Sequence, residues 1–219
     1  GPEKIVQAKG EIIEGLDASG TAVLNLDDTA FEIWRVRSAG RKVLTFSVLN
    51  SAADFHASNI TFDARGYPSF TLHSPQGEEY VQLNLLGNHN VANALAAAAA
   101  AHALGVSLLG ISTGLGSVHP VKGRTFEQWA TNGMRVIDDT YNANPSSINA
   151  AVDLLRGFTG RRVLVLGDIG DLGCWSEQGH REVGGYAAGK VDALYAVGSH
   201  MAHAVDAFGL GARHFSTQG

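Results

Sequence analysis

The second half of the chain alternates strand-like and helix-like segments, and this alternation limits the fold more than any other feature. The expected elements are a hairpin turning at residues 132–133, helices over residues 146–158, 176–188 and 199–207, and strands over residues 162–166 and 193–197. Helices between strands carry the chain back across a sheet, so that successive strands run parallel. The sequence therefore predicts an α/β domain with a parallel, doubly wound sheet.

The first half follows a different pattern. It begins with a helix-like run over residues 3–16, and five strand candidates follow over residues 21–26, 43–48, 55–62, 69–74 and 79–85. The later strands have short turns between them, which predicts an antiparallel meander. An alanine-rich helix to about residue 103 and a second helix over residues 107–114 come next. We expect two domains, residues 1–123 and 124–219, joined in a segment that contains proline and glycine.

Composition excludes several classes of protein. The 16 Lys and Arg residues are outnumbered by 21 Asp and Glu residues and form no basic stripe, which argues against nucleic acid as a partner. The single cysteine, Cys174, rules out an intramolecular disulfide and fits a reducing compartment. No stretch has the length of a membrane span, and no signal peptide is evident. We expect a soluble, cytoplasmic protein, and both ends suggest a piece of a longer one.

The most informative segment reads Ile-Asp-Asp-Thr-Tyr-Asn-Ala-Asn-Pro at residues 137–145. It follows a short β-rich run and precedes a helix whose first turn Ser146 or Ser147 could cap. A strand-to-helix turn is where open α/β sheets bind ligands, which makes its two carboxylates, its phenol and its two amides candidates for a binding site. The alternative is an ordinary turn, since Asn, Asp and Pro favour turns. Turn chemistry does not call for a tyrosine, however.

A second polar group opens the alanine-rich helix. His89, Asn90 and Asn93 can share one helical face near its N-terminus, because residues three and four apart lie side by side. Amides in such a position can hydrogen-bond the edge of a heterocycle. The alternative is helix capping by Asn88 or Asn90. Capping explains one asparagine well but three polar residues poorly.

Other segments are more ambiguous. Arg124 lies at the expected domain junction, where its planar fork could bind a phosphate, although a loop arginine is often only a solvated charge. The glycine-rich loop at residues 167–173, followed by His180, could hold a ligand or simply turn the chain. Residues 184–190 match the glycine and lysine spacing of a phosphate loop, but Val191 follows where a Ser or Thr should bind magnesium. The sequence therefore contains no genuine phosphate loop.

Taken in order, these motifs resemble the Mur ligases. They are Ala-Lys-Gly-Glu-Ile at 8–12, Gly-Asn-His-Asn-Val-Ala-Asn-Ala at 87–94, Gly-Arg at 123–124, Asp-Asp-Thr-Tyr-Asn-Ala-Asn-Pro at 138–145 and the loop with its helix at 167–180. The fourth motif resembles the branch that adds D-Ala-D-Ala, whereas sister ligases typically have an Asp-Tyr-Ala-His-type sequence there. The fifth departs from the usual Gly-Asp-Met-x-Glu-Leu-Gly, because Ile169 replaces Met and Asp171 replaces Glu.

The resemblance implies the second half of a central ATPase domain followed by the first part of a Rossmann-like C-terminal domain. The N-terminal domain and the phosphate loop would be missing, so we expect these 219 residues alone to be inactive. The full enzyme would use ATP and Mg²⁺ to phosphorylate the terminal carboxylate of UDP-MurNAc-tripeptide. The amine of D-Ala-D-Ala would then attack the acyl phosphate. We expect a monomer.

The resemblance also implies roles for individual residues. The implied roles are a carbamylated Lys9 that binds Mg²⁺, His89 beside that metal, Asn90 and Asn93 at the adenine, Arg124 at the phosphates or ribose, Asp139 at the ribose hydroxyls, and Tyr141, Asn142 and Asn144 lining a cleft between domains. Lys9 and His89 would thus take part in catalysis. Two alternatives remain: another Mur-type amino-acid ligase, and a non-catalytic nucleotide- or sugar-binding α/β module.

Overall fold

The structure, a computed structural model, describes residues 2–217. Contacts between residues divide the chain into two compact units. The first comprises Gly1–Asp63 and Tyr67–Val118, and the second comprises Ala64–Gly66 and His119–Gly219. Within the described residues, no helix is long and apolar enough to cross a membrane. Each unit has a hydrophobic core of its own and is described separately.

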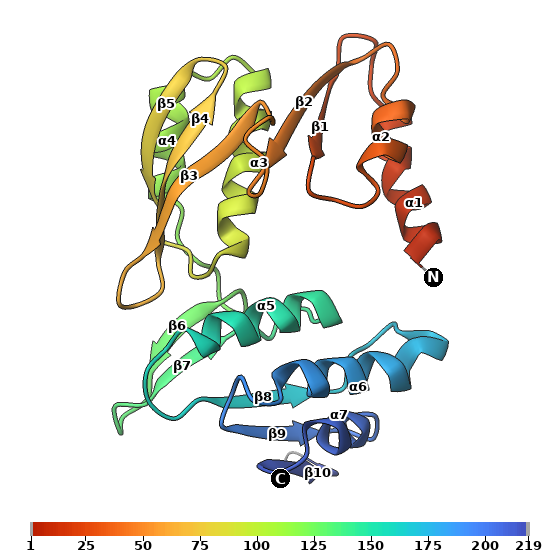
Figure 1. The fold of residues 1–219 in the computed structure, drawn as a ribbon, viewed down its shortest axis with the longest axis vertical. Helices are drawn as coiled ribbons and strands as arrows, with labels where there is room; N and C mark the ends of the chain where they lie inside the picture. Colours follow the sequence, from red (N-terminus) through yellow and green to blue (C-terminus); the bar gives the residue numbers. More distant parts are fainter. Residues whose placement is uncertain (1, 218–219) are drawn as a thin grey trace. The chain divides into compact units, whose positions relative to one another are not determined.

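The first unit is built on a five-stranded mixed sheet (Figure 1). Its strands, which lie side by side in sequence order, are β1 (Thr21–Asn25), β2 (Lys42–Ser47), β3 (Phe55–Phe62), β4 (Pro68–Ser74) and β5 (Gly77–Gln82). β1, β2 and β3 run parallel, whereas β3, β4 and β5 are antiparallel neighbours. The predicted antiparallel meander is confirmed as the second part of this sheet.

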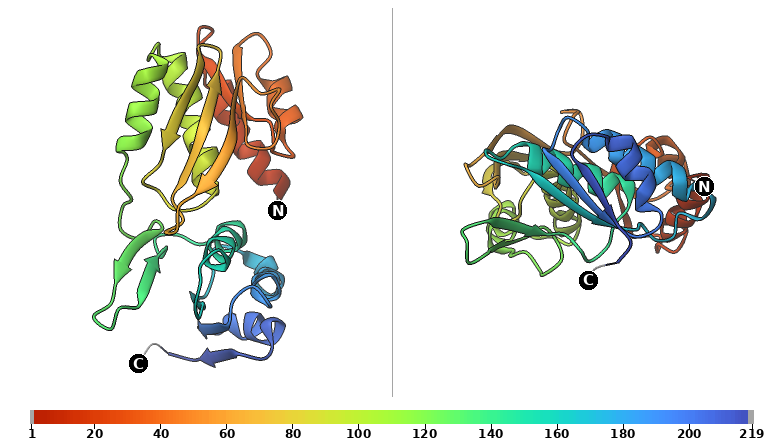
Figure 2. Two further views of the ribbon diagram at one scale, coloured as in Figure 1. Left: turned by 60° about the vertical axis from the view of Figure 1, so that its left-hand side comes forward. Right: turned by 90° about the horizontal axis from the view of Figure 1, so that it is seen from below.

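Four helices complete the first unit. They are α1 (Pro2–Glu14), α2 (Phe31–Arg37), α3 (His89–Ala103) and α4 (Leu108–Ser117). α3 packs against the sheet (Figure 2), and its Val91 and Leu95 share a core with Phe55 and Phe70 of the strands. Its alanines allow a close approach to the strands because they add little side-chain volume. Burial of a side chain the size of Leu95 contributes about 1.5–3 kcal/mol to stability.

The sequence did not predict α2. This helix has seven residues, none of them buried, so its apolar positions give too weak a period to recognise. Tertiary contacts hold it instead. The indole N–H of Trp34 donates to the carbonyl of Val6 in α1 at 3.1 Å, and a guanidinium N–H of Arg37 donates to the carbonyl of Gln7 at 2.9 Å.

The second unit contains two small sheets and their helices. Its elements are the hairpin β6 (Phe126–Trp129) and β7 (Arg135–Asp138), α5 (Pro145–Arg156), β8 (Val163–Gly167), the 3-10 turn η1 (Gly173–Trp175), α6 (Ser176–Ala187), β9 (Ala193–Val197), α7 (Met201–Phe208) and β10 (Ala212–Phe215). β8, β9 and β10 form a parallel sheet in the order β10-β9-β8. The predicted alternation of strands and helices is confirmed.

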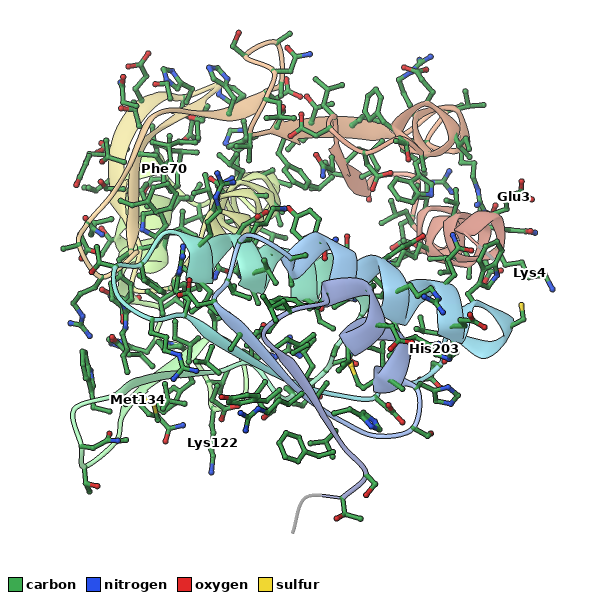
Figure 3. All side chains as sticks on the ribbon, turned by 60° about the horizontal axis from the view of Figure 1, so that its bottom comes forward. Glu3, Lys4, Phe70, Lys122, Met134 and His203 are labelled. Atoms are coloured by element: carbon green, nitrogen blue, oxygen red, sulfur yellow. The ribbon has the colours of Figure 1, made fainter. Side chains whose placement is uncertain are left out.

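The hairpin differs from the expectation in one respect. The segment after β7 lies between a strand and a helix, as predicted, but β7 does not belong to the parallel sheet. It pairs with β6 in a separate two-stranded antiparallel sheet. The tight turn at Asn132-Gly133 explains this, because it returns the chain beside the strand it has just left. Met134, which follows the turn, is 56% exposed (Figure 3).

Candidate functional site

Two segments of the second unit, residues 121–125 and 138–141, are joined by hydrogen bonds. The backbone N–H of Tyr141 donates to the carbonyl of Gly123 at 2.9 Å, and the backbone N–H of Thr125 donates to Oδ1 of Asp139 at 2.9 Å. Gly123 has a φ of +81°, and a Cβ there would lie 3.2 Å from the nitrogen of Tyr141. Only glycine suits both conditions. Arg124 is therefore held beside the Asp-Asp-Thr-Tyr motif.

Arg124 and Tyr141 form an exposed cationic surface. The guanidinium carbon of Arg124 lies 4.2 Å from the centroid of the Tyr141 ring, which is itself 69% exposed. Within the described chain, the guanidinium has neither an ion pair nor a hydrogen bond. An arginine that rests on an aromatic ring keeps its charge and its donors, so it can accept a phosphate.

The two neighbouring carboxylates have different partners. Oδ1 of Asp138 accepts hydrogen bonds from the hydroxyl of Thr140 at 2.6 Å and from its backbone N–H at 3.2 Å. The hydroxyl bond is the main reason why the pKa of Asp138 is lowered, and the charge of Lys122 adds to the effect. Asp139 uses Oδ1 for Thr125, while its Oδ2 has no partner among the described residues. Oδ2 can therefore accept a ligand hydroxyl.

The asparagines after Tyr141 have unequal roles. Asn144 caps α5: its Oδ1 accepts the N–H of Ser147 at 2.9 Å, and the Ser147 hydroxyl accepts the N–H of Asn144 at 3.0 Å. The expectation that a serine would be the N-cap was wrong, because Pro145 already begins the helix. Asn142 is exposed, and no hydrogen bond of its side chain occurs in the described part of the chain. The prediction that Asn142 and Asn144 face a substrate remains a prediction.

In the first unit, the start of α3 brings together the three polar residues predicted there. Nδ2 of Asn90 donates to the carbonyl of Leu86 at 2.9 Å and lies 3.2 Å from Nε2 of His89. Nδ2 of Asn93 donates to Oδ1 of Asn90 at 3.0 Å. Asn88 is the N-cap residue but makes no side-chain cap bond, so capping does not explain the group. Asn93 is exposed and keeps its amide oxygen for a ligand donor.

Lys9 stands apart from this group in the contacts that the structure shows. It is exposed on α1, and its amine makes no ion pair or hydrogen bond with any described residue. The described residues also contain no cluster of three or more His, Cys, Asp or Glu side chains that could hold a metal ion. An unmodified ammonium group cannot ligate Mg²⁺, which prefers oxygen ligands. These side chains as they stand therefore do not fit a magnesium site.

Hydrogen bonds fix the glycine-rich loop after β8 to the start of α7 and to α6. Oδ1 of Asp168 accepts the backbone N–H groups of His200 and Met201 at 3.0 and 2.9 Å, where α7 begins. His180 is fully buried; its Nε2 accepts the N–H of Ile169 at 3.0 Å, and its Nδ1 donates to the carbonyl of Ser176 at 2.6 Å. These bonds give a structural role to Asp168 in the loop and to His180 in the helix that follows it.

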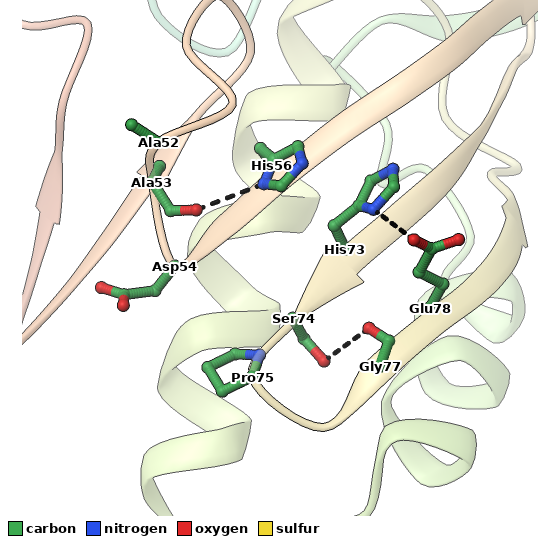
Figure 4. A pocket seen from close by; sticks show the side chains of 9 residues that line it. All are labelled: Ala52, Ala53, Asp54, His56, His73, Ser74, Pro75, Gly77 and Glu78. Atoms are coloured by element: carbon green, nitrogen blue, oxygen red, sulfur yellow. Dashed lines mark hydrogen bonds and ion pairs between the residues drawn. The ribbon is translucent and has the colours of Figure 1, made fainter.

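A hollow of about 430 Å³ lies in the first unit at residues that the sequence did not single out (Figure 4). The rings of His56 and His73 stack at its wall, with centroids 4.3 Å apart and planes 4° apart. Nδ1 of His73 lies 3.0 Å from Oε1 of Glu78. The register of β3 and β4 pairs the two histidines directly, and that cross-strand pairing is the signal that could have found them. None of the predicted site residues lines this hollow.

Comparison with known proteins explains why these motifs occur together. Residues 1–101 match the family model of the Mur ligase middle domain, and residues 123–218 match that of the Mur ligase glutamate ligase domain. The chain belongs to the Mur ligase family. The Mur-ligase resemblance seen in the motifs is therefore confirmed, and the two matches fall on either side of the segment that contains His119 and Pro120.

Two relatives found by sequence share one name. The UDP-N-acetylmuramoyl-tripeptide–D-alanyl-D-alanine ligase of Escherichia coli K12 is 41% identical over 97% of this chain and 47% of its own length. That of Haemophilus influenzae is 42% identical over 83% of this chain and 39% of its own length. A crystal structure of MurF from Acinetobacter baumannii has a TM-score of 0.93 and 36% identity, over the whole of this chain and 47% of that one. The chain thus spans about half the length of these Mur ligases.

Proposed function

We propose that this chain is part of an ATP-dependent ligase that joins D-Ala-D-Ala to UDP-MurNAc-tripeptide through an acyl phosphate, in peptidoglycan precursor synthesis. The observation that carries the proposal is the 41% identity to the E. coli ligase of that name, which extends over 97% of this chain and so includes both units. We place the two domains at residues 1–123 and 124–219. We expect the reaction in the cytoplasm, where ATP and UDP-linked precursors are made.

The candidate site supports nucleotide binding by the second unit. No described residue pairs with the guanidinium of Arg124 or with Oδ2 of Asp139, so the first suits a phosphate and the second suits a ribose hydroxyl. In the first unit, Asn90 and Asn93 offer amide groups that suit the edge of an adenine ring. Tyr141 contacts Arg124 through the face of its ring, which accepts none of the guanidinium's hydrogen bonds to a phosphate. We propose that these residues bind ATP in the complete enzyme.

The chemistry that follows needs two steps. A carboxylate oxygen of the tripeptide attacks the γ-phosphorus of ATP, ADP leaves, and the amine of D-Ala-D-Ala then displaces phosphate from the acyl carbon. Mg²⁺ bound with ATP would neutralise charge on the phosphate oxygens. Lys9, if carbamylated, and His89 are the proposed residues of the metal site. Because the sequence has no phosphate loop, the 219 residues alone should not release phosphate from ATP.

The test uses the full-length product of the gene that encodes this chain. Purified protein is incubated with ATP, Mg²⁺, UDP-MurNAc-tripeptide and D-Ala-D-Ala, and phosphate release and the mass of the product are measured. We expect release only when both precursors are present, and a product that has gained one D-Ala-D-Ala. The 219-residue chain in the same assay should be inactive.

Two outcomes would reject the proposal in favour of the alternatives. A product that has gained a single amino acid would indicate another Mur-type amino-acid ligase. Binding of a nucleotide without phosphate release under any combination of precursors would indicate a non-catalytic module. The DNA sequence upstream gives an independent check, because the ligase requires a strand followed by a glycine-rich loop with Lys and Thr or Ser.

A further inference from the structure

Thr125 has a backbone conformation that its side chain disfavours. Its φ is +50°, in the left-handed region. Among the described residues other than glycine, only Asn59 and Asp171 share a positive φ, and Asn and Asp tolerate this region better than other residues. For a β-branched residue such as threonine it is a genuine outlier. The local structure must therefore supply interactions that hold Thr125 there.

Asp139 supplies those interactions. Its Oδ1 accepts the backbone N–H of Thr125 at 2.9 Å and lies 3.4 Å from the Thr125 hydroxyl. Thr125 is 7% exposed, so its amide has little access to water when this carboxylate is absent. A buried donor without a partner is costly, and the bond is stronger because the acceptor is charged. The conformation of Thr125 consequently depends on a side chain fourteen positions later.

The residue before Thr125 is Arg124, whose orientation follows from the same arrangement. The backbone N–H of Arg124 donates to the carbonyl of Val121 at 3.0 Å, and Gly123 accepts from Tyr141. With Thr125 fixed on the other side, the backbone around Arg124 is held at both ends. If φ of Thr125 relaxed to a negative value, the chain direction after Arg124 would change, and the guanidinium would leave the Tyr141 ring.

We propose that Asp139 is a positioning residue: through the strained backbone of Thr125 it holds Arg124 where the nucleotide phosphate binds. This rests on the proposed function, and it adds a role for Oδ1 that is separate from any contact of Oδ2 with ribose. Strain at a binding site is maintained only where surrounding groups fix it, and here the fixing group is one carboxylate.

The test compares substitutions at both positions in the full-length gene product. Asp139→Ala should raise the KM for ATP about tenfold, with a smaller change in kcat. The reason is that the bond which offsets the free-energy cost of the left-handed conformation of Thr125 is lost. Added to Asp139→Ala, Thr125→Gly should lower the KM again by about threefold, since glycine adopts positive φ without cost, while the proposed ribose contact of Oδ2 stays lost. Thr125→Ala is the matched control: it removes the same hydroxyl but keeps the Cβ, and should not restore it.

A second substrate separates positioning from ribose contact. With 2′,3′-dideoxy-ATP, which has no ribose hydroxyl, Asp139→Ala should still raise KM, and Thr125→Gly should still restore it. Asp139→Asn should behave nearly as wild type with this substrate, because its amide oxygen can still accept from Thr125. If the effect of Asp139→Ala disappears with 2′,3′-dideoxy-ATP, or if glycine at position 125 restores nothing, the positioning role is wrong.

Two further results keep the test decisive. If Asp139→Ala does not fold, the double variant with Thr125→Gly should fold, and the double variant with Thr125→Ala should not. Circular dichroism and thermal melting measure folding. Equal folding of the two double variants would contradict the proposal. If the wild-type protein itself does not consume ATP with the two precursors, the proposed function fails, which is a result distinct from a failure of glycine to rescue.

Discussion

Arg124 stacks on Tyr141, with its guanidinium carbon 4.2 Å from the ring centroid. At an exposed site such a cation–π contact contributes about 0.5–1 kcal/mol, enough to favour one orientation of the arginine without neutralising its charge. The ring thus fixes where a phosphate could meet the guanidinium, and the positive charge remains available to it. We therefore expect Tyr141 to contribute to binding mainly through Arg124.

This relationship predicts graded effects on nucleotide affinity. In the full-length protein, Arg124→Ala should raise the KM for ATP about 10- to 100-fold, because a charge-assisted bond to phosphate is lost. Tyr141→Ala should raise it only about two- to fivefold, whereas Tyr141→Phe, which keeps the ring, should leave it unchanged. Steady-state kinetics with varied ATP measure all three. Equal effects of Tyr141→Ala and Tyr141→Phe would show that the hydroxyl, not the ring, matters.

Lys9 gives a prediction about covalent modification. A carbamate formed from its amine and CO₂ would convert an exposed cation into an oxygen ligand for Mg²⁺. Lys9→Ala and Lys9→Arg should then both lower kcat of the full-length protein by about 10- to 100-fold, since neither side chain can form the carbamate. Wild-type activity should also fall in buffer stripped of CO₂ and return with bicarbonate. Full activity of Lys9→Arg would show that only the positive charge is needed.

Substitution of the buried His180 should destabilise the protein locally, at the loop after β8. Its Nε2 accepts the N–H of Ile169, so His180→Leu leaves that buried amide without an acceptor and should cost about 1–3 kcal/mol. Hydrogen exchange at the Ile169 amide should accelerate, while amides of the first unit should be unaffected. His180→Gln, whose amide oxygen can reach a similar position, should retain part of the protection. Unchanged exchange at Ile169 in His180→Leu would contradict this role.

Regular elements could be predicted because their signals are local. The periodicity of α5, the alanine content of α3 and the Asn132-Gly133 turn each act over a few residues, and β3 was predicted over the residues it occupies. The helix α2 was missed because contacts with α1, far away in sequence, hold it. Propensity is a weak guide where tertiary contacts determine the structure.

The candidate site was predictable as a set of residues but not as a set of bonds. The resemblance implied binding roles for Asp139 and Tyr141, yet no sequence pattern marks Thr125 as left-handed or as the partner of Asp139. Likewise, the sequence of the loop at residues 167–173 favoured neither of two interpretations, a ligand-binding loop or a simple turn of the chain. Only the long-range bonds of Asp168 and His180 gave those two residues an internal role.

The crossing of α6 and α7 depends on one glycine. A Cβ on Gly184 would lie 2.1 Å from the backbone oxygen of Ala204, so Gly184→Ala should force the helices apart and cost about 1–3 kcal/mol. The neighbouring Gly185 is the matched control, because a Cβ there meets nothing within 4 Å apart from its neighbours and the backbone of its own helix. Gly185→Ala should stabilise the helix by about 0.5–1 kcal/mol. Thermal melting of both variants measures the difference, and equal melting temperatures would refute it.

Asp192 predicts how stability depends on pH. Its carboxylate accepts bonds from the guanidinium of Arg162 at 3.0 and 3.1 Å and from the Arg162 backbone N–H at 2.7 Å. The side-chain bond from Arg162 is the main reason why the pKa of Asp192 is lowered from 3.8 to about 2. A carboxyl whose pKa is lower in the folded state binds protons more readily when unfolded. Its stabilising effect is therefore complete above about pH 4 and is lost as the pH falls towards 2.

The difference between wild type and Asp192→Asn isolates this contribution from general acid unfolding. Above pH 4 the variant should melt at a lower temperature than wild type, and the gap should narrow steadily between pH 4 and pH 2. Asp206→Asn, a substitution of an exposed carboxylate on α7, serves as the control and should show no such narrowing. A gap that stays constant across this range would mean that Asp192 acts through its shape and hydrogen bonds, and not through its charge.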